Sequence, residues 1–333
     1  MDDLNIRREG RAGRITFTRP RALNALSHDM ALAIHAALND WRKDAGVDLV
    51  IIDAEGEKAF CAGGDIAQIY HAARDGDHSL GQAFFADEYQ MNAAIADYPK
   101  PVVSFMQGFV MGGGVGVGGH ASHRIVGDTT QIAMPETGIG MIPDVGGTWI
   151  LGRAPGRVGE YLGLTGARIG AGDAIFAGFA DHYIPEAEWP ALIARLAETG
   201  DVGEIAPHPA PKAALETADL SAFGGRDMAE IIAALEAAGD EAALKPLRRN
   251  SPLSMAVTLR AVRAARGDSR VQDSLSREHR YTHRATQEGE FIEGVRAQII
   301  DKDRNPQWQA PATPQAVDAL LAPLGDAELE WRD

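Results

Sequence analysis

The chain has 333 residues, of which 45% are hydrophobic, with one cysteine and a formal net charge of −15 at pH 7. That length allows one sizeable core with a smaller appended lobe, the single cysteine excludes an internal disulfide, and the acidic balance disfavours nucleic acid and anionic membranes as partners. Apolar runs stay well short of the roughly 20 residues that a membrane helix requires, and the first residues resemble neither a signal peptide nor a transit peptide, so we expect a cytoplasmic protein.

Strands and helices alternate at the start of the chain. Residues 13–17 and 50–53 have the short apolar pattern of strands, and Ser27 is a plausible N-cap for a helix over residues 29–42. The glycine-containing segment 58–65 (KAFCAGGD) follows the second strand and precedes a helical pattern. This order predicts a strand-to-helix turn.

A second glycine-rich segment follows the same plan. Residues 101–110 are strand-like, and residues 111–120 (MGGGVGVGGH) open a second predicted helix. Glycines at a helix start let a ligand oxygen approach backbone N–H groups that have no intrahelical partner. Amides from two such turns can converge on one oxygen, which is the arrangement of an oxyanion hole.

Two other interpretations of these glycine-rich segments are weaker. Gly114, Gly116 and Gly119 match the dinucleotide fingerprint, but a lone match is weak and the next strand-like segment lacks the expected acid. Cys61 could be a nucleophile with a histidine base, although single cysteines are more often buried and unreactive. No Cys/His group has metal-ligand spacing, so we predict no metal.

Two carboxylates stand in an otherwise uncharged run. Residues 133–148 (AMPETGIGMIPDVGGT) carry Glu136 and Asp144 among apolar residues, glycines and prolines. Loss of hydration raises the pKa of such acids unless a neighbour or a bound group stabilises the ionised form. They are therefore the best catalytic candidates. The alternative is structural: Asp144 caps a helix beginning near Val145, and Glu136 ends a strand.

The later part of the chain is predicted to be mostly helical. A helix and a short strand are expected over 172–178 and 180–184, then a glycine- and proline-rich linker over 199–211, and helices over 228–238, 251–266 and 274–287. The last helix carries a basic cluster, which we expect to be solvated or ion-paired, with phosphate binding as the alternative. Its members are Arg277, His279, Arg280, His283 and Arg284.

Three motifs in this order carry a family resemblance. Residues 59–65 (AFCAGGD), 112–114 (GGG) and 134–140 (MPETGIG) resemble the enoyl-CoA hydratase/isomerase (crotonase) superfamily. The resemblance implies an α/β fold with a ββα superhelix (spiral) core that binds an acyl-CoA, and a C-terminal helical region. It also implies that two backbone amides, here those of Gly64 and Gly113, hold the thioester oxygen.

The same resemblance implies how the molecule is organised. Residues 1–200 would form the acyl-CoA-binding core, and residues 201–333 would be the helical region that covers the site or mediates assembly. Members of the superfamily commonly form trimers or pairs of trimers, so a homo-oligomer is expected. Coenzyme A would enter as part of the substrate, and no separate cofactor is expected.

Departures from the hydratase pattern point to one branch. Hydratases carry a glutamate two residues after the glycine triplet, where this chain has Gly116, and they usually have a small residue where this chain has Asp144. Losing one carboxylate and gaining another resembles the 3-hydroxyisobutyryl-CoA hydrolase branch. Further matches to that branch are residues 84–89 (FFADEY), 111–116 (MGGGVG), 143–147 (PDVGG) and 293–303 (EGVRAQIIDKD), with Pro306 and Trp308.

The branch implies hydrolysis of a short branched 3-hydroxyacyl-CoA. A thiolate leaves readily, so one carboxylate is enough to attack the carbonyl or to deprotonate water, and a second can orient that water or hold the substrate hydroxyl. We assign the first role to Glu136 and the second to Asp144. By resemblance Glu88 would help to bind the 3-hydroxyl or the water, although a lone acid on a polar helix is usually solvated.

Local groups must bind the anionic coenzyme A, because the net charge of −15 disfavours its long-range attraction. Arg19, Arg21 and Lys58 lie beside the turns expected to face the nucleotide, although surface arginines are often simply solvated. The remaining predicted substrate contacts are Ala22, Leu23, Ala25, Ala62, Asp65 and Gly112.

Two other functions stay open. An enoyl-CoA hydratase or double-bond isomerase would use the same amides, and Gly116 counts against the two-glutamate hydratase more than against a one-carboxylate isomerase. A non-catalytic acyl-CoA-binding protein is disfavoured, because both candidate acids and both glycine turns are present.

Overall fold

The computed structural model describes residues 2–309 and 312–331, which form two compact units. Unit 1 consists of Met1–Asp65, Gln90–Ala133 and Arg168–Thr217, and unit 2 of Ile66–Tyr89, Met134–Ala167 and Ala218–Asp333. The strands of the described chain lie in unit 1, whereas unit 2 is helical. The division of roles at residue 200 stays a prediction.

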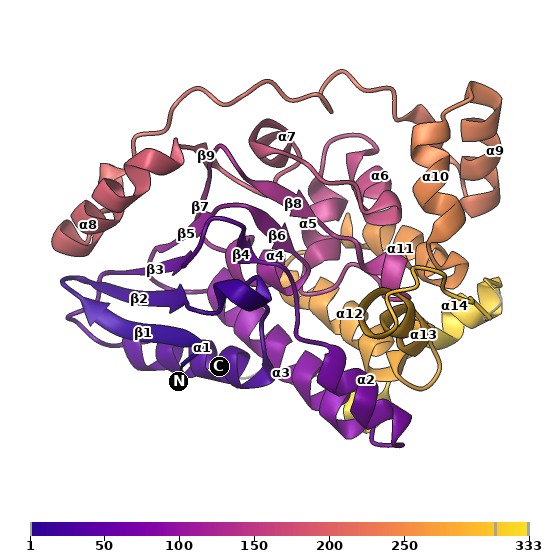
Figure 1. Ribbon diagram of the computed structural model, residues 1–333, viewed down its shortest axis with the longest axis horizontal. Coiled ribbons are helices and arrows are strands. Elements are labelled where there is room, and N and C mark those ends of the chain that lie inside the picture. The colour runs from indigo at the N-terminus through magenta and orange to yellow at the C-terminus, as the bar shows by residue number, and fades with distance from the viewer. Residues whose placement is uncertain (1, 310–311, 332–333) are drawn as a thin grey trace. The chain divides into compact units, whose positions relative to one another are not determined.

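Two sheets organise unit 1 (Figure 1). The larger sheet has the order β1-β2-β3-β5-β7-β9 and is parallel except for the antiparallel pair β1 and β2; its strands are β1 (Leu4–Glu9), β2 (Ala12–Phe17), β3 (Leu49–Ala54), β5 (Val102–Met106), β7 (His123–Val126) and β9 (His182–Tyr183). The smaller sheet is parallel, with β4 (Ala59–Cys61), β6 (Phe109–Met111) and β8 (Gln131–Ala133) in that order.

The chain visits the two sheets alternately, which produces the spiral. β3, β5 and β7 are successive neighbours in the larger sheet, and each is followed directly in sequence by a strand of the smaller sheet, β4, β6 or β8. Each of these three pairs thus adds one strand to each sheet. The predicted α/β fold with a ββα superhelical core is confirmed.

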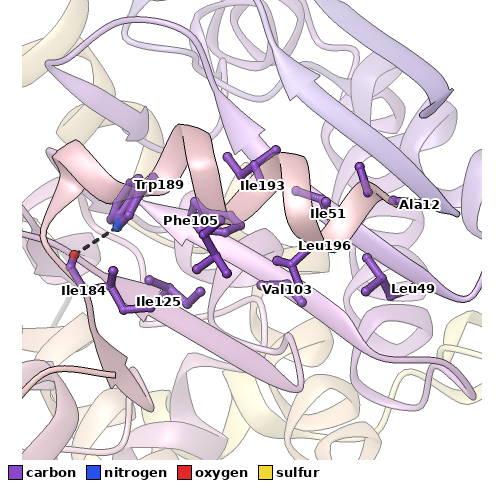
Figure 2. Close-up of a cluster of buried hydrophobic side chains, with 12 residues drawn as sticks. Ala12, Leu49, Ile51, Val103, Phe105, Ile125, Ile184, Trp189, Ile193 and Leu196 are labelled. Atoms are coloured by element: carbon purple, nitrogen blue, oxygen red, sulfur yellow. Dashed lines mark hydrogen bonds between the residues drawn. The ribbon is translucent and has the colours of Figure 1, made fainter. Parts of the chain in front are cut away.

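Helix α8 (Trp189–Thr199) covers one face of the larger sheet (Figure 2). The Trp189 ring packs edge-on against Phe105 at a centroid distance of 5.4 Å, and its Nε1–H donates to the carbonyl of Ile184 at 2.9 Å. Alternate strand residues face the helix because side chains alternate across a sheet. The buried cluster comprises Ala12, Leu49, Ile51, Val103, Phe105, Ile125, Ile184, Trp189, Leu192, Ile193, Leu196 and Ala197.

The remaining helices of unit 1 are short, apart from α1 (His28–Arg42), and they include α4 (Gly113–Gly118) and α7 (Ala171–Phe176). The prediction for α1 is confirmed, because the Ser27 side chain accepts from the Met30 amide as an N-cap. After α8 the chain has one short 3-10 turn before residue 218, which agrees with the predicted linker.

Unit 2 is built from helices. These are α2 (Ala67–Arg74), α3 (Ser79–Ala96), which continues into unit 1, α5 (Gly147–Arg153), α6 (Val158–Thr165), α9 (Met228–Ala238), α10 (Glu241–Arg249), α11 (Pro252–Ala265), α12 (Val271–Ala285), α13 (Phe291–Val295), a π-helical turn (Arg296–Ile300) and α14 (Pro314–Leu321). The prediction for α9 is confirmed residue for residue, and α12 begins three residues before its predicted start. Within the described residues, none of the helices is both long and apolar enough to span a membrane.

Candidate active site

The two acids of the uncharged run are buried in unit 2. Glu136 is 6% exposed and begins a 3-10 turn, Glu136–Ile139, and Asp144 is 5% exposed and lies before α5. The structural alternative does not hold. Gly146 is the N-cap of α5 without a side-chain cap, and β8 has already ended at Ala133, three residues before Glu136.

A sharp turn sets the direction of Asp144. Val145 has φ 53° and Gly146 has φ 76°, both in the left-handed region, and the Gly147 amide donates to the Asp144 carbonyl at 2.6 Å. A β-branched residue rarely adopts positive φ, so surrounding contacts must hold Val145 there. Backbone strain of this kind clusters at functional sites.

Tyr89 holds the Asp144 carboxylate. The Tyr89 hydroxyl donates to Asp144 Oδ2 at 2.7 Å, and Thr282 Oγ1 lies 3.3 Å from the same hydroxyl. The tyrosine is fully buried on α3, next to Glu88 in the sequence. Tyr89 was not predicted to be a partner of the site, although it ends the segment 84–89 that matches the hydrolase branch.

Glu88 belongs to the same buried group of acids. It is 2% exposed, so the alternative of a solvated helix acid does not hold. Glu88 Oε1 and Glu136 Oε2 are buried and have no hydrogen-bond partner among the described residues. Buried carboxyl oxygens are normally satisfied, so these two atoms are the available acceptors for a bound ligand or water.

Burial and mutual repulsion raise the pKa values of these acids. Burial, followed by the charge of Asp144, raises the pKa of Glu136 and the pKa of Glu88 well above the ordinary carboxyl value. Burial raises the pKa of Asp144 to about 6, and the hydrogen bond from Tyr89 opposes that rise. Raised carboxyl pKa values of this kind are common in acid–base sites.

A fourth acid, Glu278 of α12, escaped sequence analysis. It is fully buried and accepts hydrogen bonds from the backbone amides of Gly146 and Thr148 at 2.7 and 2.9 Å. Burial raises its pKa to about 7. The available signal was periodicity, because Glu278 shares the helical face of Val271 and Leu275, which are apolar.

The two glycine turns lie against each other in unit 1. Because β4 and β6 are parallel neighbours, the turns that follow them leave the same edge of the sheet. A Cβ atom added to Gly114 would lie 2.1 Å from the carbonyl oxygen of Cys61, and one added to Gly63 would lie 3.5 Å from the carbonyl oxygen of Met111. Glycine at position 114 therefore lets α4 approach the end of β4.

The backbone of the first turn exposes the Gly64 amide. Leu26 donates to the Gly63 carbonyl at 2.9 Å and accepts from the Asp65 amide at 2.8 Å, which makes Gly64 the bridged residue of a parallel pair. The N–H of such a residue points away from its partner strand. Gly113 is the first residue of α4, where the amide has no intrahelical acceptor. Their roles as thioester-binding amides stay predictions.

Most other predicted substrate contacts gather beside the first turn. The Ala62 amide donates to the Leu23 carbonyl at 3.1 Å, and the Ala25 amide donates to the Ala22 carbonyl at the same distance. Leu23 has φ 51°. Asp65 forms an ion pair with Arg19 at 3.2 Å. For Lys58, whose side chain is exposed, and for Gly112, the N-cap of α4, substrate binding stays a prediction.

The structure favours a core role for Cys61 and ion pairing for two members of the basic cluster on α12. Cys61 is buried at the end of β4, as expected for a core residue. In the cluster, Arg277 pairs with Asp268 at 2.7 Å and Arg280 with Glu328 at 2.8 Å, so these two cations are ion-paired as expected. Among the residues placed by the structure, no group of three or more His, Cys, Asp or Glu side chains is arranged to hold a metal ion.

This chain is similar to known proteins. A family model described as enoyl-CoA hydratase/isomerase matches residues 12–323. The chain belongs to this family. A relative from Gallus gallus named 3-hydroxyisobutyryl-CoA hydrolase, mitochondrial, is 36% identical over 98% of this chain and 91% of its own length.

Two solved structures share the whole fold of this family member. One, from Rhodobacter sphaeroides 2.4.1, is named an enoyl-CoA hydratase and is 53% identical, with a TM-score of 0.95, covering 99% of this chain and 100% of the other. The second, from Mycobacterium thermoresistibile, is named a carnitinyl-CoA dehydratase and is 40% identical, with a TM-score of 0.94, covering 99% of both chains. Names within the family therefore cover both hydrolysis and addition or removal of water.

Proposed function

We propose that this enzyme hydrolyses a short branched 3-hydroxyacyl-CoA thioester to the hydroxy acid and coenzyme A. The preferred substrate in this proposal is 3-hydroxyisobutyryl-CoA, as in valine breakdown. The observation that carries the proposal is the set of acids. Glu136 and Asp144 are buried in unit 2, while the position of the first hydratase glutamate is Gly116. The 36% identical chicken relative bears the name of this activity.

The proposed chemistry begins at the thioester carbonyl. The amides of Gly64 and Gly113 stabilise the negative charge that develops on its oxygen. The Glu136 carboxylate either attacks the carbonyl carbon, forming a mixed anhydride that water then opens, or takes a proton from the attacking water. In both routes the carbon–sulfur bond breaks and coenzyme A leaves as a thiolate, whose conjugate acid has a pKa of about 8.5 if it resembles cysteine.

The other two acids position the reactants in this proposal. Asp144, held by the Tyr89 hydroxyl at 2.7 Å, orients the water or binds the substrate hydroxyl. Glu88 contributes its buried and unpartnered Oε1 to the 3-hydroxyl or to the same water. A substrate hydroxyl would give Glu88 Oε1 the hydrogen-bond partner that it lacks among the described residues.

One assay separates the proposal from its alternatives. Purified enzyme is mixed with 3-hydroxyisobutyryl-CoA and, separately, with an enoyl-CoA, while a thiol reagent and the enoyl absorbance are followed. Release of free thiol from the first substrate supports hydrolysis. Loss of enoyl absorbance without thiol release would support a double-bond isomerase or a hydratase, the activity named for one of the solved relatives. Tight binding without either signal would indicate a non-catalytic protein.

Cofactors, assembly and location are proposed together with the activity. Coenzyme A is part of the substrate, and we propose that no further cofactor or metal takes part. Homo-oligomers, trimers or hexamers, are proposed on family grounds, and sedimentation velocity tests this. A cytoplasmic location is also proposed. The net charge of −15 disfavours nucleic-acid and anionic-membrane partners. Cell fractionation tests the location, because the chicken relative is named mitochondrial.

A further inference from the structure

Glu278 is a buried acid at a position where a helix normally presents an apolar side chain. It is fully buried on α12, on the same face as Val271, Leu275 and Tyr281. Burying a carboxylate without partners is costly, so such a residue is retained only where strong hydrogen bonds compensate. Its partners therefore indicate what it does.

Among the described residues, its hydrogen-bond donors lie just after Asp144, at Gly146 and in the first turn of α5 at Thr148. Glu278 Oε2 accepts from the Gly146 amide at 2.7 Å, and Oε1 accepts from the Thr148 amide at 2.9 Å and from the Thr148 hydroxyl. These donors are two and four residues beyond Asp144. One side chain from α12 thus fixes the backbone on the C-terminal side of this acid.

That backbone needs an external restraint. Val145, between Asp144 and Gly146, has φ 53°, a backbone conformation that is strained for a β-branched residue. Free of its partners, the turn would relax toward ordinary dihedrals and rotate the Asp144 side chain. The 2.7 Å hydrogen bond from Tyr89 to Asp144 depends on that side chain staying where it is.

We propose that Glu278 is a positioning residue for the hydrolysis: it holds residues 144–148 so that the Asp144 carboxylate keeps its place beside the Tyr89 hydroxyl. The proposal rests on the proposed function, because Asp144 is the group through which Glu278 acts.

The first test replaces one carboxylate oxygen. Glu278→Gln keeps the shape of the side chain but turns an NH2 group toward one of the two backbone N–H groups. We expect kcat for 3-hydroxyisobutyryl-CoA to fall on the order of tenfold to a hundredfold, since small misplacements cost that much, while KM changes less than about twofold. An unchanged kcat would overturn the proposal.

Glu160 provides a matched control. It is also a fully buried glutamate of unit 2, but it pairs with Arg157, Arg263 and Arg266 rather than with the turn. Glu160→Gln should lower the melting temperature and leave kcat per folded molecule within about twofold of wild type. An equal loss of kcat in both variants would mean that the effect of Glu278→Gln is general destabilisation.

A double-mutant cycle tests the route of the effect. If Glu278 acts through Asp144, then adding Glu278→Gln to Asp144→Asn should change kcat by less than about twofold. The same fold loss in both backgrounds would show that Glu278 acts elsewhere.

A final measurement does not depend on turnover. Amide hydrogen exchange at Gly146 and Thr148, followed by NMR, should become at least about tenfold faster in Glu278→Gln and stay unchanged in Glu160→Gln. If wild type fails to hydrolyse any acyl-CoA but this exchange still accelerates, the proposed function fails while the restraint on the turn stands. Unaltered exchange overturns the restraint itself.

Discussion

Glu136 combines burial with an oxygen that has no partner among the described residues. As a nucleophile or base it must act as the carboxylate, but burial and the charge of Asp144 raise its pKa well above the ordinary value. Burial thus disfavours the ionised form that either role requires. If Glu136 attacks the thioester or takes a proton from water, as proposed, the rate should depend on the loss of its proton.

Replacing this carboxyl by an amide should remove the reaction but not the binding. For Glu136→Gln we expect kcat/KM to fall by about 10³-fold or more, because nucleophilic or base function is lost while the shape is kept. The dissociation constant of coenzyme A, measured by calorimetry, should change less than about threefold. Wild-type turnover in this variant would take Glu136 out of the mechanism.

The pH dependence of kcat/KM tests the electrostatic coupling between Glu136 and Asp144. With wild type, kcat/KM should rise with pH as Glu136 loses its proton. Asp144→Asn removes a negative charge that raises the pKa of Glu136, so the acidic limb of the profile should move to lower pH, although the maximum is reduced. Asp128→Asn, at an exposed acid of unit 1, is the control and should leave the limb in place. A limb that does not move in Asp144→Asn would contradict the coupling.

At the scale of elements, the ends of two helices show what could be predicted from the sequence and what could not. The bounds of helix α9 agree with those predicted from the helical pattern, and the structure shows that Asp227 caps its start and Gly239 its end. Helix α12 begins earlier than predicted, since its N-cap is Arg270, a residue type that gives no capping signal; the compensating bond from the Arg270 amide to Asp273 appears only in three dimensions.

The active-site acids show the same limit. Glu136 and Asp144 were found because they stand out in an uncharged run, whereas Glu278 lies among charged residues of α12 and resembles a solvated side chain. Its three hydrogen bonds join residues 130 or more positions apart in the chain. Sequence spacing carries no information on such a pairing. The two acids could therefore be singled out as candidates from sequence, whereas the side chain that supports Asp144 could not.

The approach of α4 to β4 depends on a glycine. Gly114→Ala would place a methyl carbon 2.1 Å from the Cys61 carbonyl oxygen, so the helix start must shift away from the first glycine turn. We expect a loss of about 2 kcal/mol or more in the free energy of unfolding, and at least a hundredfold loss of kcat/KM in any folded fraction.

Urea denaturation and the thiol assay measure these two effects. Gly267→Ala is the control, because its new methyl would meet its nearest atom at an ordinary 3.6 Å. Full activity in Gly114→Ala would show that the position of α4 is unimportant for catalysis.

The packing of α8 on the larger sheet stabilises the fold in two ways, through the buried volume of the Trp189 ring and through its hydrogen bond. Trp189→Ala should cost about 3–5 kcal/mol, because the ring against Phe105 is lost and a cavity remains. Trp189→Phe keeps most of the ring but leaves the Ile184 carbonyl without its donor, and should cost about 1–2 kcal/mol. Guanidinium unfolding gives both values, and equal costs for the two variants would contradict this division.

On the scale of the whole molecule, the buried acids should reduce stability as the price of activity. A carboxyl whose pKa is higher in the folded state than in the unfolded state stabilises the fold fully only while it is protonated in both states. As pH rises through the folded-state value, which is about 6 for Asp144 and about 7 for Glu278, the fold must hold buried charge. Stability therefore falls between about pH 4 and pH 7.

Removing one of these charges should then make the protein more stable at alkaline pH. Asn at position 144 can still accept from the Tyr89 hydroxyl, so Asp144→Asn should raise the free energy of unfolding at pH 8 by about 2–3 kcal/mol, the equivalent of roughly two pKa units. The gain should shrink as pH falls and vanish below about pH 4, where both states are protonated. Urea denaturation of wild type and variant from pH 4 to pH 8 measures this difference. Glu160→Gln, which loses ion pairs with three arginines, should instead be less stable than wild type at pH 8. A difference between Asp144→Asn and wild type that does not change with pH would mean that the Asp144 carboxylate is not under electrostatic strain, and the buried acids would then carry no cost in stability.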